Sequence, residues 1–274
     1  MTDARATIIE PSSGWRALDV AELWRYRELL YFLAWRDVKV RYKQAALGIA
    51  WAVIQPVAAT LVFALIFGRF AGLPSDGSPY VLFAFIGVLC WTYFANAVAA
   101  AGTSLVANTH LVSKVYFPRL LVPLSAAAPG LIDLLVGLVL LLGLVAYFGV
   151  PLSGRIVLIP FFLAVGAIAA VAVGIWLAAL DVRYRDVRYV VPFLLQVWMF
   201  GTPVVYSSSL LPEAVRPFYS LNPMVGVIDG CRWAILGGDN PPTSIVVSFV
   251  AVLLIFVSGV FYFHRVERSF ADVI

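Results

Sequence analysis

Long apolar stretches recur along this chain, and each is long enough to cross a lipid bilayer. A transmembrane helix needs about 20 apolar residues, because about 30 Å of hydrocarbon is crossed at about 1.5 Å per residue. Backbone polar groups find no partners in lipid, so these stretches are expected to be helices. They cover approximately residues 49–68, 80–102, 119–148, 156–180, 190–206 and 244–263. The sequence therefore predicts an all-α integral membrane protein, with six transmembrane helices in a domain of residues 49–263.

The composition agrees with this fold class. Of the 274 residues, 62% are hydrophobic and only 12% are charged, whereas soluble domains are about 25% charged. The third apolar stretch is the longest, and Pro123 and Pro129 are expected to kink or break its first half. The fifth stretch is the shortest.

Basic residues lie mainly on one side of the predicted spans. With an even number of spans both termini share a side, and Lys and Arg favour the cytoplasmic one. If that side holds residues 1–48, the loops 103–119 and 181–189 and the tail 264–274, it contains 15 of the 19 Lys and Arg residues. We therefore expect both termini in the cytoplasm. The net charge of +4 is then a topology signal, and no nucleic-acid partner is expected.

A basic segment rich in Trp and Tyr runs directly into the first span. At 100° per residue its apolar and aromatic residues fall in one stripe. These residues are Trp24, Tyr31, Trp35, Val38, Tyr42 and Ala45. The cations on the opposite and lateral faces are Arg25, Arg36, Lys39 and Lys43. This pattern predicts an amphipathic helix in the membrane interface, whose cations meet anionic headgroups or an acidic protein groove. A plain anchor with no further task is the alternative.

Two short cytoplasmic segments have unusual chemistry. Residues 110–119 place Val, Tyr and Phe beside two cations, which favours docking into a groove of a partner protein. Residues 181–189 are dense in charge, and a docking site and a solvated loop explain this segment equally well.

The outer segment 207–242 is too apolar to be a free loop. Its prolines break it into short pieces. We therefore expect short helices in the outer leaflet, which either form an outer gate or only cap the bundle. Asp229 and Arg232, three positions apart, can pair on one such helix.

Few polar residues lie within the predicted spans. Asp133 is near mid-membrane, where an ionised carboxylate costs about 2.5 to 3.5 kcal/mol, and a single acid fits an interhelical hydrogen bond better than a proton relay. Gln55 and Gln196 are interpreted in the same way. Cys90 and Cys231 are interpreted as packing residues, because a disulfide between a span and an outer segment would need an unlikely geometry.

Several aromatic residues lie deeper in the spans than interfacial belts explain. They are Trp91, Tyr93, Phe94, Trp198 and Phe200. Sugar rings pack their C–H faces on aromatic planes, so these residues could line a path for a glycan. Ordinary packing of rings between helices explains each of them equally well.

Catalytic and metal-binding motifs are absent from the sequence. Neither His110 nor His264 has a Cys or His companion at metal-ligand spacing, so no metal site is expected. There is no Gly-x-x-x-x-Gly-Lys-Ser/Thr phosphate loop and no His-Glu-x-x-His motif. We therefore expect a chain that is not an enzyme and holds no cofactor. Any transport is powered by a nucleotide-binding partner or by an ion gradient, and the single intramembrane acid disfavours the gradient.

Five ordered motifs resemble those of ABC-2 type permeases of the O-antigen and teichoic-acid exporter family. The first is Arg36-Asp-Val-Lys-Val-Arg-Tyr-Lys-Gln44, followed by Leu47-Gly48, Trp51 and Gln55-Pro56. The others are Lys114-Val-Tyr-Phe-Pro-Arg119, Asp181-Val-Arg-Tyr-Arg-Asp186, Pro203-Val-Val-Tyr206 and Leu221-Asn-Pro223. The resemblance covers about residues 29–265. Ala45 departs from it, at a position where a small hydroxyl residue is common.

The resemblance implies the transmembrane subunit of an ATP-driven exporter. Such permeases pair as homodimers, engage a separate ATPase subunit that holds ATP and Mg, and move a lipid-linked polysaccharide outward across the bacterial inner membrane. Candidates for contact with headgroups or pyrophosphate are Arg36, Lys39, Arg41 and Lys43. Candidates for coupling to the ATPase are Lys114, Tyr116, Phe117, Arg119, Arg183 and Arg185. Candidates along the substrate path are Trp51, Trp91, Tyr93, Phe94, Trp198, Phe200 and Tyr206. The first and fifth spans would form the seam through which lipid enters.

Three other functions remain open. An ABC-2 exporter of drugs or small lipids shares the same architecture. A membrane glycosyltransferase or acyltransferase would need an acid or His site, which we do not find. A gradient-driven transporter would require Asp133 to be essential.

Overall fold

The computed structural model of this chain describes residues 20–43, 48–151, 153–238, 241–267 and 270. These residues form helices joined by turns, and none of them lies in a strand. The prediction of an all-α fold is confirmed. Three positions of the first motif, Gln44, Ala45 and Leu47, lie outside the described residues.

Five helices in the described part of the chain are long and apolar enough to cross a membrane. They are Gly48–Phe70, Tyr80–Ala107 (α4), Leu121–Tyr147, Gly154–Arg183 and Ser244–Glu267 (α12). The first combines a 3₁₀ turn η1 (Gly48–Ala50), α3 (Trp51–Phe63) and a π-helical end η2 (Ala64–Phe70). The fourth combines a 3₁₀ turn η3 (Gly154–Leu158) with α8 (Ile159–Arg183). These spans match five of the six predicted stretches.

The third span breaks where its prolines predicted a break. α6 (Leu121–Ala126) is followed at Ala127 by α7 (Ala128–Tyr147). Pro129 lies in the first turn of α7, where a missing backbone N–H costs no helical hydrogen bond. In the middle of an unbroken helix, Pro129 would remove one backbone hydrogen bond.

The fifth predicted stretch forms a shorter helix than expected. α9 covers Val187–Phe200, which is 14 residues or about 21 Å at about 1.5 Å per residue. The helix stops at Gly201 and Pro203, because proline cannot donate the next backbone hydrogen bond. The freed carbonyl of Gly201 accepts instead from the Asn222 amide at 3.0 Å. Residues 190–206 therefore do not form one helix of full membrane length in the described structure.

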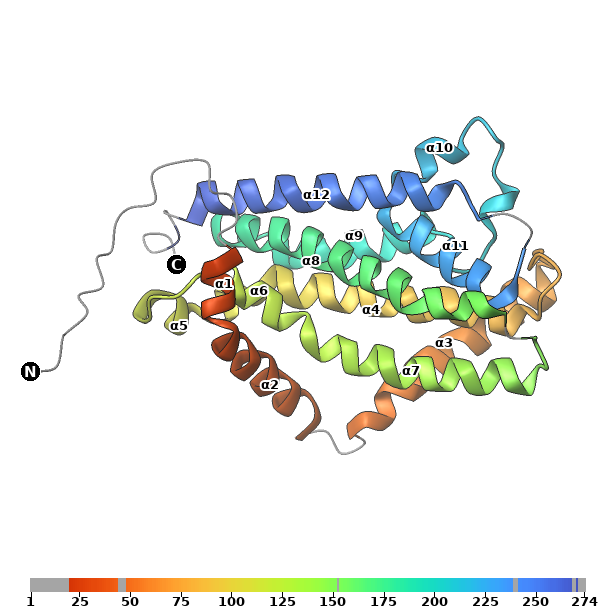
Figure 1. The fold of residues 1–274 in the computed structure, drawn as a ribbon, viewed down its shortest axis with the longest axis horizontal. Helices are drawn as coiled ribbons and strands as arrows, with labels where there is room; N and C mark the ends of the chain where they lie inside the picture. The colour runs from red at the N-terminus through yellow and green to blue at the C-terminus, as the bar shows by residue number, and fades with distance from the viewer. Residues whose placement is uncertain (1–19, 44–47, 152, 239–240, 268–269, 271–274) are drawn as a thin grey trace, which may run out of the picture.

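The long helices lie side by side, with α4 at the centre of the bundle (Figure 1). α4 contacts α3, α6, α7, α8, α9 and α11 (Pro223–Leu236). Its phenylalanine side chains, Phe83, Phe85 and Phe94, are no more than 1% exposed. α1 (Val20–Arg25) and the last turn of α12 lie at one end of this bundle, and α10 (Arg216–Tyr219) lies at the other (Figure 1).

Small residues let α4 and α8 approach closely. A Cβ atom placed on Gly174 of α8 would lie 2.5 Å from the Cβ of Ala101, and one on Gly102 of α4 would lie 3.1 Å from Leu177. Helices in lipid gain little from the hydrophobic effect on associating, so close van der Waals contact of this kind holds them together. The glycines therefore set the spacing of the two central helices.

The predicted N-terminal helix is present but is interrupted at Tyr26. α1 precedes α2 (Arg27–Lys43), which packs on α6 and α7. The buried face of α2 carries Leu33, while Tyr31 and Trp35 of the predicted aromatic stripe are exposed. α2 slants away from the bundle axis, and its last turn and the start of α3 approach each other beside the bundle (Figure 1). Exposed rings on a slanted helix suit the predicted position in a membrane interface.

Short helices form in the predicted outer segment. A 3₁₀ turn η4 (Ser208–Leu210), α10 and α11 follow one another at the end of the bundle opposite α1. α11 packs against α4, α8 and α12 and is almost entirely buried. It folds back into the bundle, so this part of the segment is a structural element of the core.

This return of α11 corrects two sequence-based expectations. The Sγ atoms of Cys90 and Cys231 lie 3.9 Å apart, although the sequence placed them in separate regions. Both cysteines are free and buried, so the prediction that they are packing residues is confirmed. Asp229 and Arg232 form no direct ion pair in the described structure. Arg232 instead donates to the backbone oxygen of Val204 at 2.7 Å. Burial lowers the pKa of Arg232 to about 10, so its guanidinium stays charged at neutral pH.

The packing of α4 against α8 predicts a specific effect of Gly174→Ala. The new methyl group would overlap Ala101, and the overpacking should cost about 1–3 kcal/mol of stability. Gly143→Ala on α7 is the matched control, because nothing lies within 4 Å of a Cβ at that position. Thermal unfolding of both variants in detergent measures the difference, and equal midpoints would contradict the prediction.

Candidate functional site

A polar cleft lies between α2, α3, α4 and α7. Its volume is about 190 Å³, and we call it the α2–α7 cleft. The residues that carry its chemistry are Arg41, Tyr42, Trp51, Gln55, Thr92, Tyr93, Asn96 and Asp133. The cleft thus places cationic, carboxylate, hydroxyl and amide groups beside two large aromatic rings.

Asp133 is the acidic centre of the cleft. Its Oδ2 forms an ion pair with Arg41, and its Oδ1 accepts a hydrogen bond from the Tyr42 hydroxyl at 2.5 Å. Burial, and then the bond to Asp133, raises the pKa of Tyr42 above its usual value, so this hydroxyl remains a proton donor. The predicted interhelical role of Asp133 is confirmed, and the partner helix is α2.

The two glutamines differ from their prediction. Gln55 lines the cleft and Gln196 is exposed on α9. Neither makes a side-chain hydrogen bond to another residue described within the chain, so the predicted interhelical bonds of these two side chains are not found.

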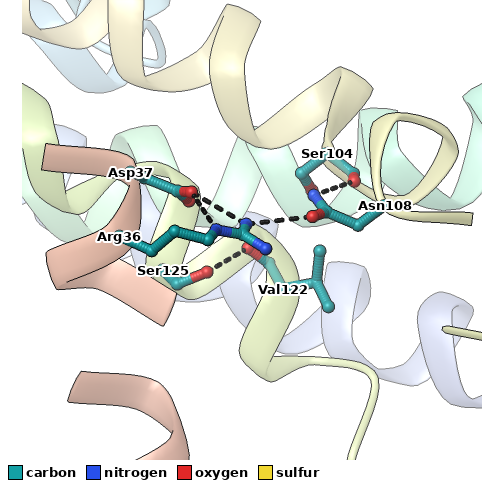
Figure 2. A network of polar contacts seen from close by, with 6 residues as sticks. All are labelled: Arg36, Asp37, Ser104, Asn108, Val122 and Ser125. Atoms are coloured by element: carbon teal, nitrogen blue, oxygen red, sulfur yellow. Dashed lines mark hydrogen bonds and ion pairs between the residues drawn. The ribbon is translucent and has the colours of Figure 1, made fainter. Parts of the chain in front are cut away.

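The four predicted cations of α2 have different surroundings. Arg36 binds Asp37 at 2.8 Å and the Asn108 side-chain oxygen at 2.9 Å. Figure 2 shows how this arginine reaches from α2 to the end of α4, where the Asn108 amide in turn donates to the backbone of Ser104. Lys39 lies over the Trp35 ring at 5.5 Å. Lys43 is exposed. Arg41 is therefore the cation that reaches the cleft, and Arg36 ties α2 to α4.

The predicted path aromatics divide into two groups. Trp51, which is 48% exposed, and Tyr93 both line the cleft. Trp91, Phe94 and Trp198 form a cluster of rings between α4 and α9, with centroids 5.3 to 6.3 Å apart. Within one chain this second group is part of helix packing.

Two further path candidates lie near the end of α9. Phe200 is 57% exposed. The Tyr206 hydroxyl donates to the Phe200 backbone oxygen at 2.9 Å and lies 2.9 Å from the Tyr219 hydroxyl. Tyr206 thereby closes the turns that follow α9.

The predicted docking segment 110–119 is only partly exposed. α5 (Thr109–Lys114) ends in an exposed Lys114, and Tyr116 is 73% exposed. Phe117 is 5% exposed and packs in an apolar cluster with residues of α6, α8 and α12. The expectation that Phe117 is exposed is therefore wrong: the ring holds the segment on the bundle. Arg119 is held on the end of α12, where its guanidinium binds the Glu267 backbone oxygen.

The second charged segment is exposed at the same end of the bundle. Arg183 is the last residue of α8 and Arg185 follows the helix; both are exposed, and the Arg183 guanidinium lies 5.5 Å from the Tyr184 ring centre. Asp181 is only 1% exposed and lies 3.7 Å from Arg188. This end of the bundle therefore exposes the cations Arg183 and Arg185, and the buried acid Asp181 lies close to Arg188.

Sequence reasoning missed two polar residues of the cleft. Thr92 and Asn96 lie on α4, four positions apart, and both line the cleft. Residues at i and i+4 share one helix face. Two polar residues on one face of an apolar helix were therefore a usable signal.

The five long apolar helices define a multi-pass membrane protein. The chain belongs to the ABC-2 type transporter family, which it matches over residues 28–236. The match begins at α2 and ends with α11, so it includes the cleft. The family resemblance of the sequence motifs is confirmed.

Curated relatives match nearly the whole chain. The O-antigen export system permease protein RfbA of Myxococcus xanthus is 31% identical over 253 residues, which cover 90% of this chain and 96% of the relative. A protein of the same name from Klebsiella pneumoniae is 26% identical over 248 residues, covering 90% and 95%. This chain therefore corresponds to these relatives over almost their full length.

The contact between Arg41 and Asp133 predicts a measurable coupling. Arg41 is 38% exposed, so solvent screens the pair and the coupling should be about 0.5–1 kcal/mol. A double-mutant cycle of Arg41→Ala and Asp133→Ala, followed by SDS-induced unfolding, measures it. Arg41→Ala combined with the distant Glu213→Ala is the control and should be additive. Additivity of the Arg41 and Asp133 changes would show that the pair contributes nothing.

Proposed function

We propose that this chain is the transmembrane subunit of an ATP-driven exporter, which moves a lipid-linked polysaccharide of O-antigen or teichoic-acid type outward across the bacterial inner membrane. The observation that carries the proposal is the similarity to O-antigen export permeases over 96% of the length of one relative. A permease that lacks its own phosphate-binding loop needs a nucleotide-binding partner, which would hold ATP and Mg.

The proposed topology places both termini in the cytoplasm. α9 and the turns 201–206 together make the sixth crossing, since they return the chain from the end of α8 to the end that carries α10. The end with α1 and the last turn of α12 is then cytoplasmic, which agrees with the location of 15 of the 19 Lys and Arg residues in segments 1–48, 103–119, 181–189 and 264–274.

The ATPase would dock at this cytoplasmic end. Lys114, Tyr116, Arg183 and Arg185 are exposed there. Phe117 and Arg119 have another role in this proposal, because they fix the exposed residues to the bundle. A displacement of Tyr116 by the ATPase would therefore be transmitted to α6 and α12 through Phe117 and Arg119.

The α2–α7 cleft would receive the headgroup of the lipid-linked substrate. Guanidinium groups bind phosphate oxygens in a planar, bidentate geometry, and Arg41 is a partly exposed guanidinium in the cleft. A pyrophosphate would compete with Asp133 for Arg41. Trp51 and Tyr93 provide ring faces for the first sugar. Lys39 and Lys43 are exposed on the same helix and would attract the anion.

A homodimer would complete the path. The described helices bury most of the central helix α4, and six helices are too few to enclose a polymer-wide channel. α3 and α9 both present exposed apolar side chains, and we propose that they face the second copy or the entering lipid. Representative side chains are Ile54, Leu61, Val62, Phe193, Leu194 and Val197.

Reconstitution with the ATPase subunit tests the proposed function. Proteoliposomes that contain both proteins should hydrolyse ATP faster when a lipid-linked glycan is present and should transfer that glycan across the bilayer. A non-hydrolysable ATP analogue should stop the transfer. Stimulation by a small lipid but not by the glycan would favour the small-lipid exporter. Transfer that continues without ATP and stops when an ion gradient is dissipated would favour a gradient-driven transporter.

The cations of α2 provide a second prediction. Lys39→Ala combined with Arg41→Ala should lower export by about tenfold or more, because a charge-assisted phosphate contact is lost. Arg25→Ala combined with Arg27→Ala is the matched control on the same N-terminal segment. Both double variants should reach the membrane at the level of the unmodified chain. Unchanged export by the Lys39 and Arg41 variant would remove these residues from the proposed substrate site.

A further inference from the structure

A second cavity lies at the end of the bundle opposite α1, among the short helices. Its volume is about 430 Å³, and we call it the α10–α11 pocket. The turn before α4, η4, α10, α11 and the start of α12 all contribute to its wall. This volume lies within the range of about 300–1,000 Å³ that is typical of small-molecule sites. None of the residues assigned above to the substrate cleft or to coupling lines it.

Hydroxyl groups form much of the wall of this pocket. Three separate segments contribute these hydroxyl groups. The residues include Ser207, Ser208, Ser209, Ser220, Thr243 and Ser244. Each hydroxyl can donate one hydrogen bond and accept others. Such a wall suits a ligand that is itself rich in hydroxyl groups.

Two carboxylates are fixed within this hydroxyl wall. Both oxygens of Asp229 lie 2.8 Å from the Ser208 hydroxyl, and one lies 2.9 Å from the Ser244 hydroxyl. Asp76 accepts from Ser207 at 2.5 Å. A carboxylate oxygen can accept more than one hydrogen bond. Both acids therefore keep acceptor capacity for a ligand hydroxyl.

The wall of the pocket carries two acidic and two basic side chains, so their formal charges cancel. Arg216 and Arg232 oppose the two carboxylates, and both guanidinium groups are already bound to backbone oxygens, including Ser209 for Arg216 and Val204 for Arg232. Within the described parts of the chain, no group of three or more His, Cys, Asp or Glu side chains could hold a metal ion. A neutral ligand fits this balance better than a phosphate or a metal ion.

Trp233 adds an aromatic ring to the wall of this pocket. The Arg155 guanidinium lies 4.8 Å from the ring centre and holds the ring in place. The indole Nε1 is buried, so the ring is the part of Trp233 that would contact the C–H face of a sugar.

We propose that the α10–α11 pocket binds a neutral saccharide unit, which Asp229 and the surrounding serines hold by its hydroxyl groups and Trp233 holds by its ring. The assignment to the exported glycan rests on the proposed function, because that function makes this end of the bundle the outer one. The pocket would then hold the glycan as it leaves the permease.

Saturation-transfer difference NMR on the full chain in phosphatidylcholine nanodiscs tests the pocket directly. The probes are trisaccharides of mannose, galactose, rhamnose and N-acetylglucosamine. We expect saturable binding of at least one of them, and Trp233→Ala and Asp229→Asn should each weaken it by about tenfold. Trp24→Ala removes an exposed indole at the other end of the bundle, and Glu213→Gln removes an exposed carboxylate that does not line the pocket; both should bind as the unmodified chain does.

Several outcomes would overturn the proposal. They are the absence of saturable binding by all four probes, equal binding by the Trp233 and Asp229 variants, and binding of inorganic phosphate or phosphoethanolamine in place of the saccharides. Thermal unfolding verifies that the variants fold. If Asp229→Asn does not fold, Ser208→Ala, which removes one donor to the same carboxylate, replaces it. Export with the ATPase is measured separately: export without saccharide binding rejects only the pocket, and saccharide binding without export rejects only the proposed function.

Discussion

The close contact of α4 with α8 is the packing on which the rest of the molecule depends. Lipid chains are as apolar as the helix surfaces, so two helices stay together only where their atoms fit closely. Gly174 and Ala101 provide that fit. Once α4 is fixed at the centre, its two halves serve different sites. Thr92 and Tyr93 line the α2–α7 cleft, and Phe83 lines the α10–α11 pocket.

The parts of the fold that follow from local physics could be predicted from the sequence. A span is set by the thickness of the hydrocarbon and by the need to pair every backbone group, and both act on a continuous stretch. The break at Ala127 follows from Pro129 in the same way. The early end of α9 also has a local cause, in Gly201 and Pro203. A prediction from hydropathy alone misses this end, because the apolar stretch 190–206 continues beyond these two residues.

The tertiary contacts could not be predicted in this way. The return of α11 brings Cys231 to Cys90, which are 141 positions apart. Tyr42 and Asp133 are 91 positions apart, so the partner of the acid was invisible to any local pattern. Phe117 lay in an apparent docking motif, yet its burial depends on α8 and α12. The motifs located Arg41 and Trp51 in the candidate site. Asn96 shares a polar face of α4 with Thr92, but only the packing of α4 against α3 and α7 shows that this face lines the cleft.

α12 connects the two ends of the molecule. Its last turn is bound to Arg119 through Glu267, and its first residue, Ser244, donates to Asp229 at 2.9 Å. A helix of 24 residues is about 36 Å long and resists compression along its axis, because every turn is closed by hydrogen bonds. Residues 110–119 and the α10–α11 pocket at the opposite end are thus joined by one long helix. An axial shift of about one ångström at Arg119 would change the Ser244 to Asp229 hydrogen bond before any helix needed to bend.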